Sequence, residues 1–239
     1  MEAPEHLAPL ARDPGRSALV LDVDGTLAPI APRPELATVP AETRAELERL
    51  VDRYLLVACV SGRAGEDARR LVGVGGIELV GNHGLELDPR AHELAGEIAR
   101  FRDAVALPVE DKTLSLTYHY REAEDENSAR AELEEVARRA GEAGFDARWG
   151  RKVLEIRPAV EANKGTAVRT LVERSGARLG LYAGDDTTDL DGFAGLRSLG
   201  LEHAVCVAVA SAEGPAELRE AADLVVAGPE ELAVLLRQL

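Results

Sequence analysis

Lysine is scarce in this 239-residue sequence, because only three of its 28 basic residues are lysines and the others are arginines. The three are Lys112, Lys152 and Lys164. Arginine presents a planar fork of donors, whereas lysine is a compact and mobile point charge. A chain with this bias should keep lysine mainly where arginine fails, so the scarcity singles out these three positions.

Positive charge, cysteine and long apolar runs are also in short supply. The formal net charge of −15 argues against nucleic acid or an anionic membrane as a partner. No apolar run approaches the roughly 20 residues that span a bilayer, and the first sixteen residues lack the apolar segment of a secretory signal. Cys59 and Cys206 lie in apolar, strand-like segments, which favours buried thiols. We therefore expect a cytoplasmic protein.

Short apolar runs alternate with helical patterns along most of the chain. This alternation is typical of a doubly wound α/β fold with a parallel sheet. Helices are predicted after Pro40, after Arg63 and from Lys164 onward. The predicted buried strands are residues 19–22, 55–60, 78–80, 179–183, 205–209 and 224–226.

The pattern changes between residues 88 and 158. Residues 113–120 alternate as a strand exposed on one face, 129–143 read as an Arg/Glu-rich helix, and 146–157 as a strand or a hairpin. Strands exposed on one face indicate an antiparallel α+β unit. The sequence therefore predicts a Rossmann-like core of residues 1–87 and 159–239, interrupted by a smaller α+β insert of residues 88–158.

The segment Asp22-Val23-Asp24-Gly25-Thr26 directly follows the first apolar run. Ligands of such sheets bind outside the carboxyl ends of the strands. Two carboxylates two residues apart repel each other unless a cation or a proton lies between them, and a turn that only had to be polar could use one Asp, Asn or Ser. The segment therefore predicts a nucleophile, Asp22, a proton-transfer residue, Asp24, and a divalent metal.

Three further segments occupy comparable places in the predicted core. Ser61-Gly62-Arg63 follows a buried strand and starts a helix, so its hydroxyl and backbone N–H groups suit an anion. In Asn163-Lys164-Gly165 a lysine begins a helix. Gly184-Asp185-Asp186-Thr187-Thr188-Asp189 is an acidic cluster after an apolar strand. Hard carboxylate oxygens with no matching His or Cys set favour Mg²⁺ over Zn²⁺.

These four segments, in this order, resemble the haloacid dehalogenase superfamily of aspartate-nucleophile phosphatases. The resemblance implies that Asp22 forms an aspartyl phosphate and that Asp24 protonates the leaving alcohol and then activates water. It also implies that Ser61 and Lys164 hold phosphate oxygens. The implied Mg²⁺ ligands are Asp22, Asp24 through its backbone carbonyl, and Asp185, with Asp186 and Asp189 in support.

The insert narrows the resemblance. Its clusters Lys112-Thr113-Leu114-Ser115, His119-Tyr120-Arg121 and the stretch Gly-Arg-Lys-Val-Leu-Glu-Ile-Arg-Pro at 150–158 resemble trehalose-6-phosphate phosphatases, as does Gly-Asn-His-Gly-Leu-Glu at 81–86. In that family the insert caps the active site, and Lys112 and Glu155 would bind sugar hydroxyls. The residues that the resemblance assigns to the sugar phosphate are Gly62, Arg63, Asn82, His83, Lys112, His119, Arg121, Arg151 and Glu155.

Other interpretations of the same residues stay open. The substrate could be another sugar phosphate, such as sucrose phosphate or a mannosyl- or glucosyl-phosphoglycerate, and a sugar phosphomutase would share the nucleophile. His119 and Arg121 could lie on a solvated face, and His83 could be a core histidine. We expect three aromatic residues of the insert to lie in its hydrophobic core and not to stack on a sugar, namely Tyr118, Tyr120 and Trp149.

Two different classes of protein fit less well. A receiver-like signalling module also combines clustered aspartates with a lysine, but it needs about half this length and no Asp two residues after its phosphorylated one. It would leave the insert unexplained. A binding protein with an inactive site is disfavoured, because every predicted catalytic position is occupied.

Overall fold

The computed structural model describes residues 5–31, 33–121, 123–150, 152–210 and 214–239. The chain divides into two compact units, Met1–Gly84 with Ala162–Leu239 and Leu85–Glu161. We call them the core unit and the cap unit. The division falls three residues outside the predicted insert at each end. Among the described residues, no helix is both long and apolar enough to cross a membrane.

The core unit contains the predicted parallel sheet. Its six strands follow the order β10-β9-β8-β1-β2-β3, and every neighbouring pair is parallel. Each predicted strand is present to within two residues, so the doubly wound fold is confirmed. The strands are β1 (Ser17–Leu21), β2 (Leu56–Val60), β3 (Glu78–Val80), β8 (Leu179–Gly184), β9 (His203–Val209) and β10 (Leu224–Val226).

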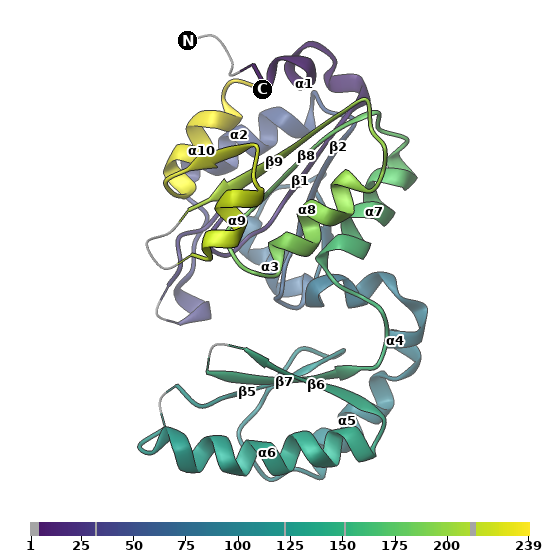
Figure 1. The fold of residues 1–239 in the computed structure, drawn as a ribbon, viewed down its shortest axis with the longest axis vertical. Helices are drawn as coiled ribbons and strands as arrows, with labels where there is room; N and C mark the ends of the chain where they lie inside the picture. Colours follow the sequence, from purple (N-terminus) through teal and green to yellow (C-terminus); the bar gives the residue numbers. More distant parts are fainter. Residues whose placement is uncertain (1–4, 32, 122, 151, 211–213) are drawn as a thin grey trace. The chain divides into compact units, whose positions relative to one another are not determined.

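Helices cover both faces of this sheet (Figure 1). Leu19 of β1 and Leu181 of β8 share a hydrophobic cluster with Leu47 of α2. Tyr182, the next residue along β8, points to the opposite face, where a Cβ on Gly192 of α8 would lie 2.4 Å from its ring. The α-helices of the core unit are α1 (Ala8–Arg12), α2 (Ala41–Val51), α3 (Gly65–Val72), α7 (Lys164–Ser175), α8 (Asp189–Arg197), α9 (Ala216–Ala221) and α10 (Pro229–Leu236). Short 3₁₀ segments are η1 (Pro14–Arg16), η2 (Pro34–Leu36) and η3 (Asn82–Leu87), and η3 is interrupted at His83 and Gly84.

Helices α7 and α8 approach at the level of their backbones. A Cβ on Gly165 would lie 2.3 Å from the carbonyl oxygen of Asp191, and a Cβ on Gly195 would lie 2.4 Å from that of Gly165. The first turn of α7 is thereby fixed against α8. Because α7 begins at Lys164 and α8 at Asp189, this packing brings those two residues together.

The two predicted cysteine environments are also observed. Cys59 on β2 and Cys206 on β9 are both buried and free. Burial raises the pKa of the Cys59 thiol, which keeps it protonated and inert.

The cap unit is an antiparallel sheet with helices on one face. The register places Leu116 opposite Ile156 and Thr117 opposite Glu155. Leu116 and Ile156 belong to a hydrophobic cluster with residues of α5 and α6, which cover that face (Figure 1), while Thr117 and Glu155 lie on the other face. The strand order is β4-β5-β7-β6, from β4 (Glu110–Asp111), β5 (Leu116–His119), β6 (Phe145–Gly150) and β7 (Val153–Pro158), and the helices are α4 (Pro89–Glu93), α5 (Ala95–Asp103) and α6 (Glu126–Glu142).

Local hydrogen bonds move two element boundaries in the cap unit. The strand predicted from residue 113 begins at Leu116, because Thr113 has φ +69° in a turn where its N–H donates to Asp111. The helix predicted from residue 129 begins at Glu126, because the Asp125 carboxylate accepts from two backbone N–H groups and caps it. Of the two alternatives for residues 146–157, the structure has the hairpin.

Gly165→Ala tests the contact between α7 and α8. The added methyl meets backbone atoms that cannot rotate away, so we expect the free energy of unfolding to fall by about 1–3 kcal/mol. Gly141→Ala in α6 is the matched control, because a Cβ there meets nothing within 4 Å and helix propensity should raise stability by roughly 0.5–1 kcal/mol. Urea unfolding followed by circular dichroism measures both. Equal stability changes in the two variants would contradict the close approach.

Candidate active site

Four of the predicted site segments lie along one edge of the core sheet. Strands β8, β1, β2 and β3 are consecutive neighbours and run in the same direction. Asp185, Asp22, Ser61 and Asn82 follow the carboxyl ends of these strands within two residues. The edge that topology predicts as a ligand site therefore carries the predicted residues.

Lys164 is the buried centre of the site. Its Nζ atom lies 2.7 Å from Asp22 Oδ1 and 2.6 Å from Asp189 Oδ1, and its side chain is 4% exposed. The lysine is held at the first position of α7 by a capping box, in which Asn163 accepts from the N–H of Thr166 and the Thr166 hydroxyl accepts from the N–H of Asn163. The Asn163 side chain thus caps α7, as an aspartate at this position could also do.

Asp189 has a hydrogen-bond donor for each of its lone pairs. Its Oδ1 atom accepts from Lys164 Nζ and from the Tyr182 hydroxyl at 2.6 Å. Its Oδ2 atom accepts from the backbone N–H groups of Asp185 at 3.0 Å and Asp186 at 2.9 Å. A carboxylate offers about four lone-pair sites, so Asp189 is saturated and serves to hold Lys164 and the loop after β8.

Tyr182 is a site residue that sequence reasoning missed. Its ring is fully buried on β8, and burial followed by the Asp189 carboxylate raises the pKa of the phenol well above its ordinary value. The phenol is therefore a donor to Asp189. A signal was present, because a tyrosine inside an otherwise aliphatic buried strand needs a partner for its hydroxyl, and two aspartates follow three and four residues later.

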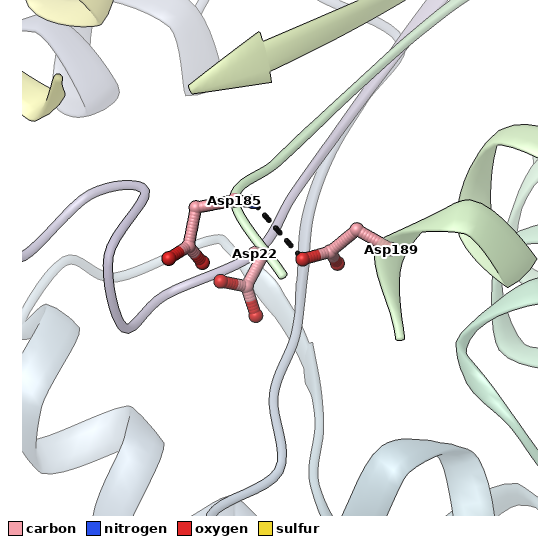
Figure 2. Close-up of side chains that lie close together, drawn as sticks. All are labelled: Asp22, Asp185 and Asp189. Atoms are coloured by element: carbon pink, nitrogen blue, oxygen red, sulfur yellow. Dashed lines mark hydrogen bonds between the residues drawn. The ribbon is translucent and has the colours of Figure 1, made fainter. Parts of the chain in front are cut away.

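Three carboxylates converge at this point, as Figure 2 shows. One ligand atom from each of Asp22, Asp185 and Asp189 lies within 4.8 Å of the others. The donor set fits a hard divalent cation, because it consists of carboxylate oxygens only. Since Asp189 already accepts four hydrogen bonds, Asp22 and Asp185 are the carboxylates with capacity for a direct bond to metal. Asp186 is exposed, accepts from the N–H of Thr187 and lies outside this cluster.

The electrostatics of the cluster favour an added cation. Burial raises the pKa of Asp22, and this effect outweighs the opposing attraction of Lys164. Burial raises the pKa of Asp185 as well, and the nearby charges of Asp22 and Asp189 add to it. Burial alone would lower the pKa of Lys164, but the two carboxylates that it contacts raise it. The lysine is therefore charged, and the negative charge beside it exceeds what one ammonium balances.

The loop after β1 fits tightly against Asp185. Asp22 Oδ2 accepts a hydrogen bond from the Thr26 hydroxyl at 3.1 Å. Gly25 has φ +82°, and a Cβ at this position would lie 2.0 Å from Asp185 Oδ2. Glycine is thus required here both by the backbone conformation and by the space that the Asp185 carboxylate fills.

Backbone hydrogen bonds join the Ser61 turn to the segment after β3. The N–H of Asn82 donates to the Arg63 carbonyl at 2.7 Å, and the N–H of His83 donates to the Ser61 carbonyl at 2.9 Å. Asn82 and His83 have φ values of +51° and +52°. A Cβ on Gly62 would lie 2.6 Å from the His83 ring, so the glycine makes room for the histidine. The structure therefore brings these five predicted residues together.

Arg63 and Asp24 form an ion pair that the sequence did not predict. The Arg63 guanidinium donates to both Asp24 oxygens, at 2.7 Å and 2.6 Å. The Asp24 side chain is 33% exposed and that of Arg63 is 18% exposed. Arg63 is thus attached to the predicted proton-transfer residue.

In the cap unit, the structure joins part of the predicted sugar-binding set. The Ser115 hydroxyl donates to Glu155 Oε1 at 3.1 Å, and the N–H of Lys112 donates to the Ser115 carbonyl at 3.0 Å. The polar face of the cap sheet therefore carries Glu155, with Ser115 against it and Lys112 in the adjoining turn. His119 is exposed, with its Nε2 atom 2.7 Å from Glu110 Oε2.

The remaining predictions for the cap have mixed outcomes. Tyr118 and Tyr120 are in the hydrophobic core, as interpreted from the sequence. Trp149, also expected there, is 37% exposed and lies under the Arg130 guanidinium at 4.6 Å, so that interpretation was wrong. Arg121 is exposed in the turn after β5. Arg151 lies outside the described residues.

The parallel core sheet, with Asp22 after β1 and a lysine and an acidic loop beside it, defines the fold of the haloacid dehalogenase-like hydrolases. Within this class the chain belongs to the trehalose-phosphatase family, whose sequence pattern matches residues 20–97 and 107–228.

Three similar proteins illustrate the relationship. A trehalose-phosphate phosphatase of Mycobacterium marinum is 34% identical over 222 residues, which cover 80% of this chain and 55% of that protein. An uncharacterized glycosyl hydrolase of Mycobacterium tuberculosis is 37% identical over 211 residues, 78% of this chain and 16% of that protein. The crystal structure of a trehalose-6-phosphate phosphatase related protein matches with a TM-score of 0.73 and 25% identity, covering 92% of this chain and 96% of the other. The chain thus spans about a sixth to about half the length of these two curated relatives.

The acidic cluster predicts a pH-dependent stability in the absence of divalent metal. The pKa of Asp185 is higher in the folded protein than in the unfolded chain. Above the unfolded-state pKa the folded protein therefore binds more protons than the unfolded chain, and its free energy of unfolding falls as the pH rises toward the folded-state pKa. Asp185→Asn removes the titration. We expect the variant to gain on the order of 1–2 kcal/mol relative to the unsubstituted protein between pH 5 and pH 8 in EDTA. Thermal unfolding at both pH values measures the difference. A stability gap that does not change with pH would contradict the charged cluster.

Proposed function

We propose that this protein hydrolyses trehalose-6-phosphate to trehalose and phosphate, in the cytoplasm, through an aspartyl-phosphate intermediate and with Mg²⁺. The observation that carries the proposal is the buried Lys164 against Asp22 at the end of β1, in a chain of the trehalose-phosphatase family. A buried ammonium beside a carboxylate at this edge suits a phosphate group that arrives with further negative charge. The small-molecule substrate is the partner we propose, with neither nucleic acid nor membrane.

The chemistry divides into two displacements at phosphorus. In the first, an Asp22 oxygen bonds to phosphorus while the bond from phosphorus to the sugar oxygen breaks, and Asp24 gives that oxygen a proton. In the second, water bonds to phosphorus, gives a proton to Asp24, and the bond to Asp22 breaks. Lys164 and Ser61 bind phosphate oxygens in both. These steps return both aspartates to their starting state.

We assign the metal to Asp22, Asp185 and the Asp24 backbone carbonyl. Asp189 supports this site by holding the loop after β8 through the N–H groups of Asp185 and Asp186. A supporting role of the Asp186 carboxylate stays an expectation from the sequence, because it is exposed and lies outside the cluster. When bound, Mg²⁺ supplies positive charge that lets a carboxylate nucleophile and a phosphate dianion approach each other. The donor chemistry of the cluster and its excess negative charge support this assignment.

We assign sugar recognition to the polar face of the cap sheet. Glu155 and Lys112 offer a charged acceptor and a charged donor, which suit the hydroxyls of a disaccharide better than an apolar surface. A panel of sugar phosphates that includes sucrose phosphate and a mannosyl-phosphoglycerate tests the substrate. Phosphate release separates hydrolysis from a phosphomutase, which would return phosphate to the sugar.

Asp22→Asn tests the nucleophile. The amide keeps the shape of the side chain but cannot attack phosphorus, so phosphate release from trehalose-6-phosphate should fall to background while the protein stays folded. In the unsubstituted protein, EDTA should abolish release and Mg²⁺ should restore it. Release is measured with a colorimetric phosphate assay and folding by thermal unfolding. Near-normal turnover of the variant, or full activity in EDTA, would refute the proposed chemistry.

Lys112→Ala and Lys112→Arg test recognition by the cap unit. A charge-assisted hydrogen bond to a sugar hydroxyl is worth roughly 1.5–3 kcal/mol, so its loss should lower kcat/KM for trehalose-6-phosphate by roughly 10–100-fold. A small aryl phosphate should be affected little. Lys112→Arg should fail almost as badly, because a fork does not replace a point charge.

Lys152→Ala is the matched control for these variants. Lys152 is a lysine of the same unit, and its ammonium pairs with Glu126 on the surface. We expect its loss to leave both substrates nearly unaffected. If Lys112→Ala lowered the rates on both substrates equally, Lys112 would be part of the structure of the cap and not of its recognition surface.

A further inference from the structure

The Arg63 side chain connects three segments of the core unit. Its Nε and Nη2 atoms donate to the two oxygens of Asp24, and its Nη1 atom donates to the Pro34 carbonyl at 3.1 Å. The resemblance assigns Arg63 to the sugar phosphate, and that assignment stays a prediction. In the structure the Arg63 fork contacts the Asp24 carboxylate, and its Nη1 atom contacts the backbone of η2.

A bidentate contact of this kind fixes a carboxylate more strictly than a single hydrogen bond. Two parallel N–H···O bonds align the planes of the guanidinium and the carboxylate, so the Asp24 side chain has one orientation. The backbone of Asp24 is fixed separately, because Asp24 pairs with Ala28 in an isolated bridge and the N–H of Gly25 donates to the Ala28 carbonyl. The turn therefore fixes the backbone position of Asp24, and Arg63 fixes the orientation of its carboxylate.

The base of Arg63 belongs to the proposed phosphate-binding turn. Its N–H donates to the Ser61 hydroxyl oxygen at 3.2 Å, and its carbonyl accepts from Asn82. Arg63 is thus anchored to Ser61 at one end and to Asp24 at the other. A residue placed in this way transmits the position of the phosphate-binding turn to the proton-transfer residue.

We propose that Arg63 is a positioning residue that holds the Asp24 carboxylate in place for proton transfer to the leaving oxygen. This inference rests on the proposed function, since it requires Asp24 to act as acid and base. Each Asp24 oxygen has a second lone-pair site beside the one that Arg63 occupies, so the pair leaves room for the transferred proton. Arg63 acts through Asp24 and needs no contact with the sugar.

The dependence on the leaving group tests this role. Without Arg63 the Asp24 carboxylate rotates freely, and part of the ~10²–10⁴-fold effect typical of general acid catalysis should be lost. We expect Arg63→Ala to slow the burst of phosphoenzyme formation from trehalose-6-phosphate by about 10–100-fold. The burst from an aryl phosphate should be slowed much less, because a phenolate leaves without a proton and the later attack of water is not part of the burst. Arg63→Lys should recover little, since one ammonium cannot form the fork.

A double-mutant cycle with Asp24→Asn separates positioning from substrate binding. If Arg63 acts through Asp24, Arg63→Ala should cause no further loss on trehalose-6-phosphate once Asp24 is Asn. An additive loss or a rise in KM alone would assign Arg63 to the substrate, and a faster Arg63→Ala enzyme would make the ion pair inhibitory. Each of these results overturns the proposal. Arg178→Ala, which removes an exposed arginine from its ion pair with Glu202, is the matched control and should behave as the unsubstituted protein.

A structural measurement keeps the test independent of the substrate. In a crystal structure of Arg63→Ala, the Asp24 carboxylate should leave the orientation described here, and a carboxylate that keeps it overturns the proposal. If the unsubstituted protein releases phosphate from a different sugar phosphate, the assigned substrate is wrong. The comparison with the aryl phosphate is then made with that sugar phosphate, and the role of Arg63 is judged by the same outcomes.

Discussion

The site depends on one buried ammonium shared by two buried carboxylates. Lys164 contacts Asp22 and Asp189, and none of the three side chains is more than 5% exposed. A buried charge is tolerated only when it is paired, so the end of β1 and the first turns of α7 and α8 must meet at this point. The glycines at the contact of α7 with α8 permit that meeting. Packing and charge thus impose the same geometry.

The parallel sheet could be predicted because its strands are buried on both faces and are therefore continuous apolar runs in the sequence. The residues at which elements of the cap unit begin could not be predicted. The start of β5 depends on the left-handed backbone of Thr113, and the start of α6 depends on the Asp125 cap. The alternation of polar and apolar residues reveals neither the backbone conformation of Thr113 nor the cap. Both are decided by hydrogen bonds between side chain and backbone.

In the site, too, the positions of the motifs along the sequence predicted some features and not others. Four motifs at strand ends and helix starts predicted which residues meet at the sheet edge. The partners of individual side chains were not predicted, namely Arg63 on Asp24 and Tyr182 on Asp189, because such pairs depend on rotamers and on distant segments of the chain. Lysine scarcity was also an uneven guide, as Lys152 makes a surface ion pair that an arginine could also make.

Gly25 lies where two loops of the site approach each other most closely. The Asp185 carboxylate fills the space where a side chain at position 25 would be. The loop that carries Asp24 and the loop that carries Asp185 are therefore in close contact. A larger residue at position 25 would displace the Asp185 carboxylate from its position. Because glycine has a hydrogen atom where other residues have Cβ, two loops that are distant in sequence can lie in contact here. A change at position 25 would therefore alter the spacing between Asp24, the proposed proton-transfer residue, and Asp185, a proposed metal ligand.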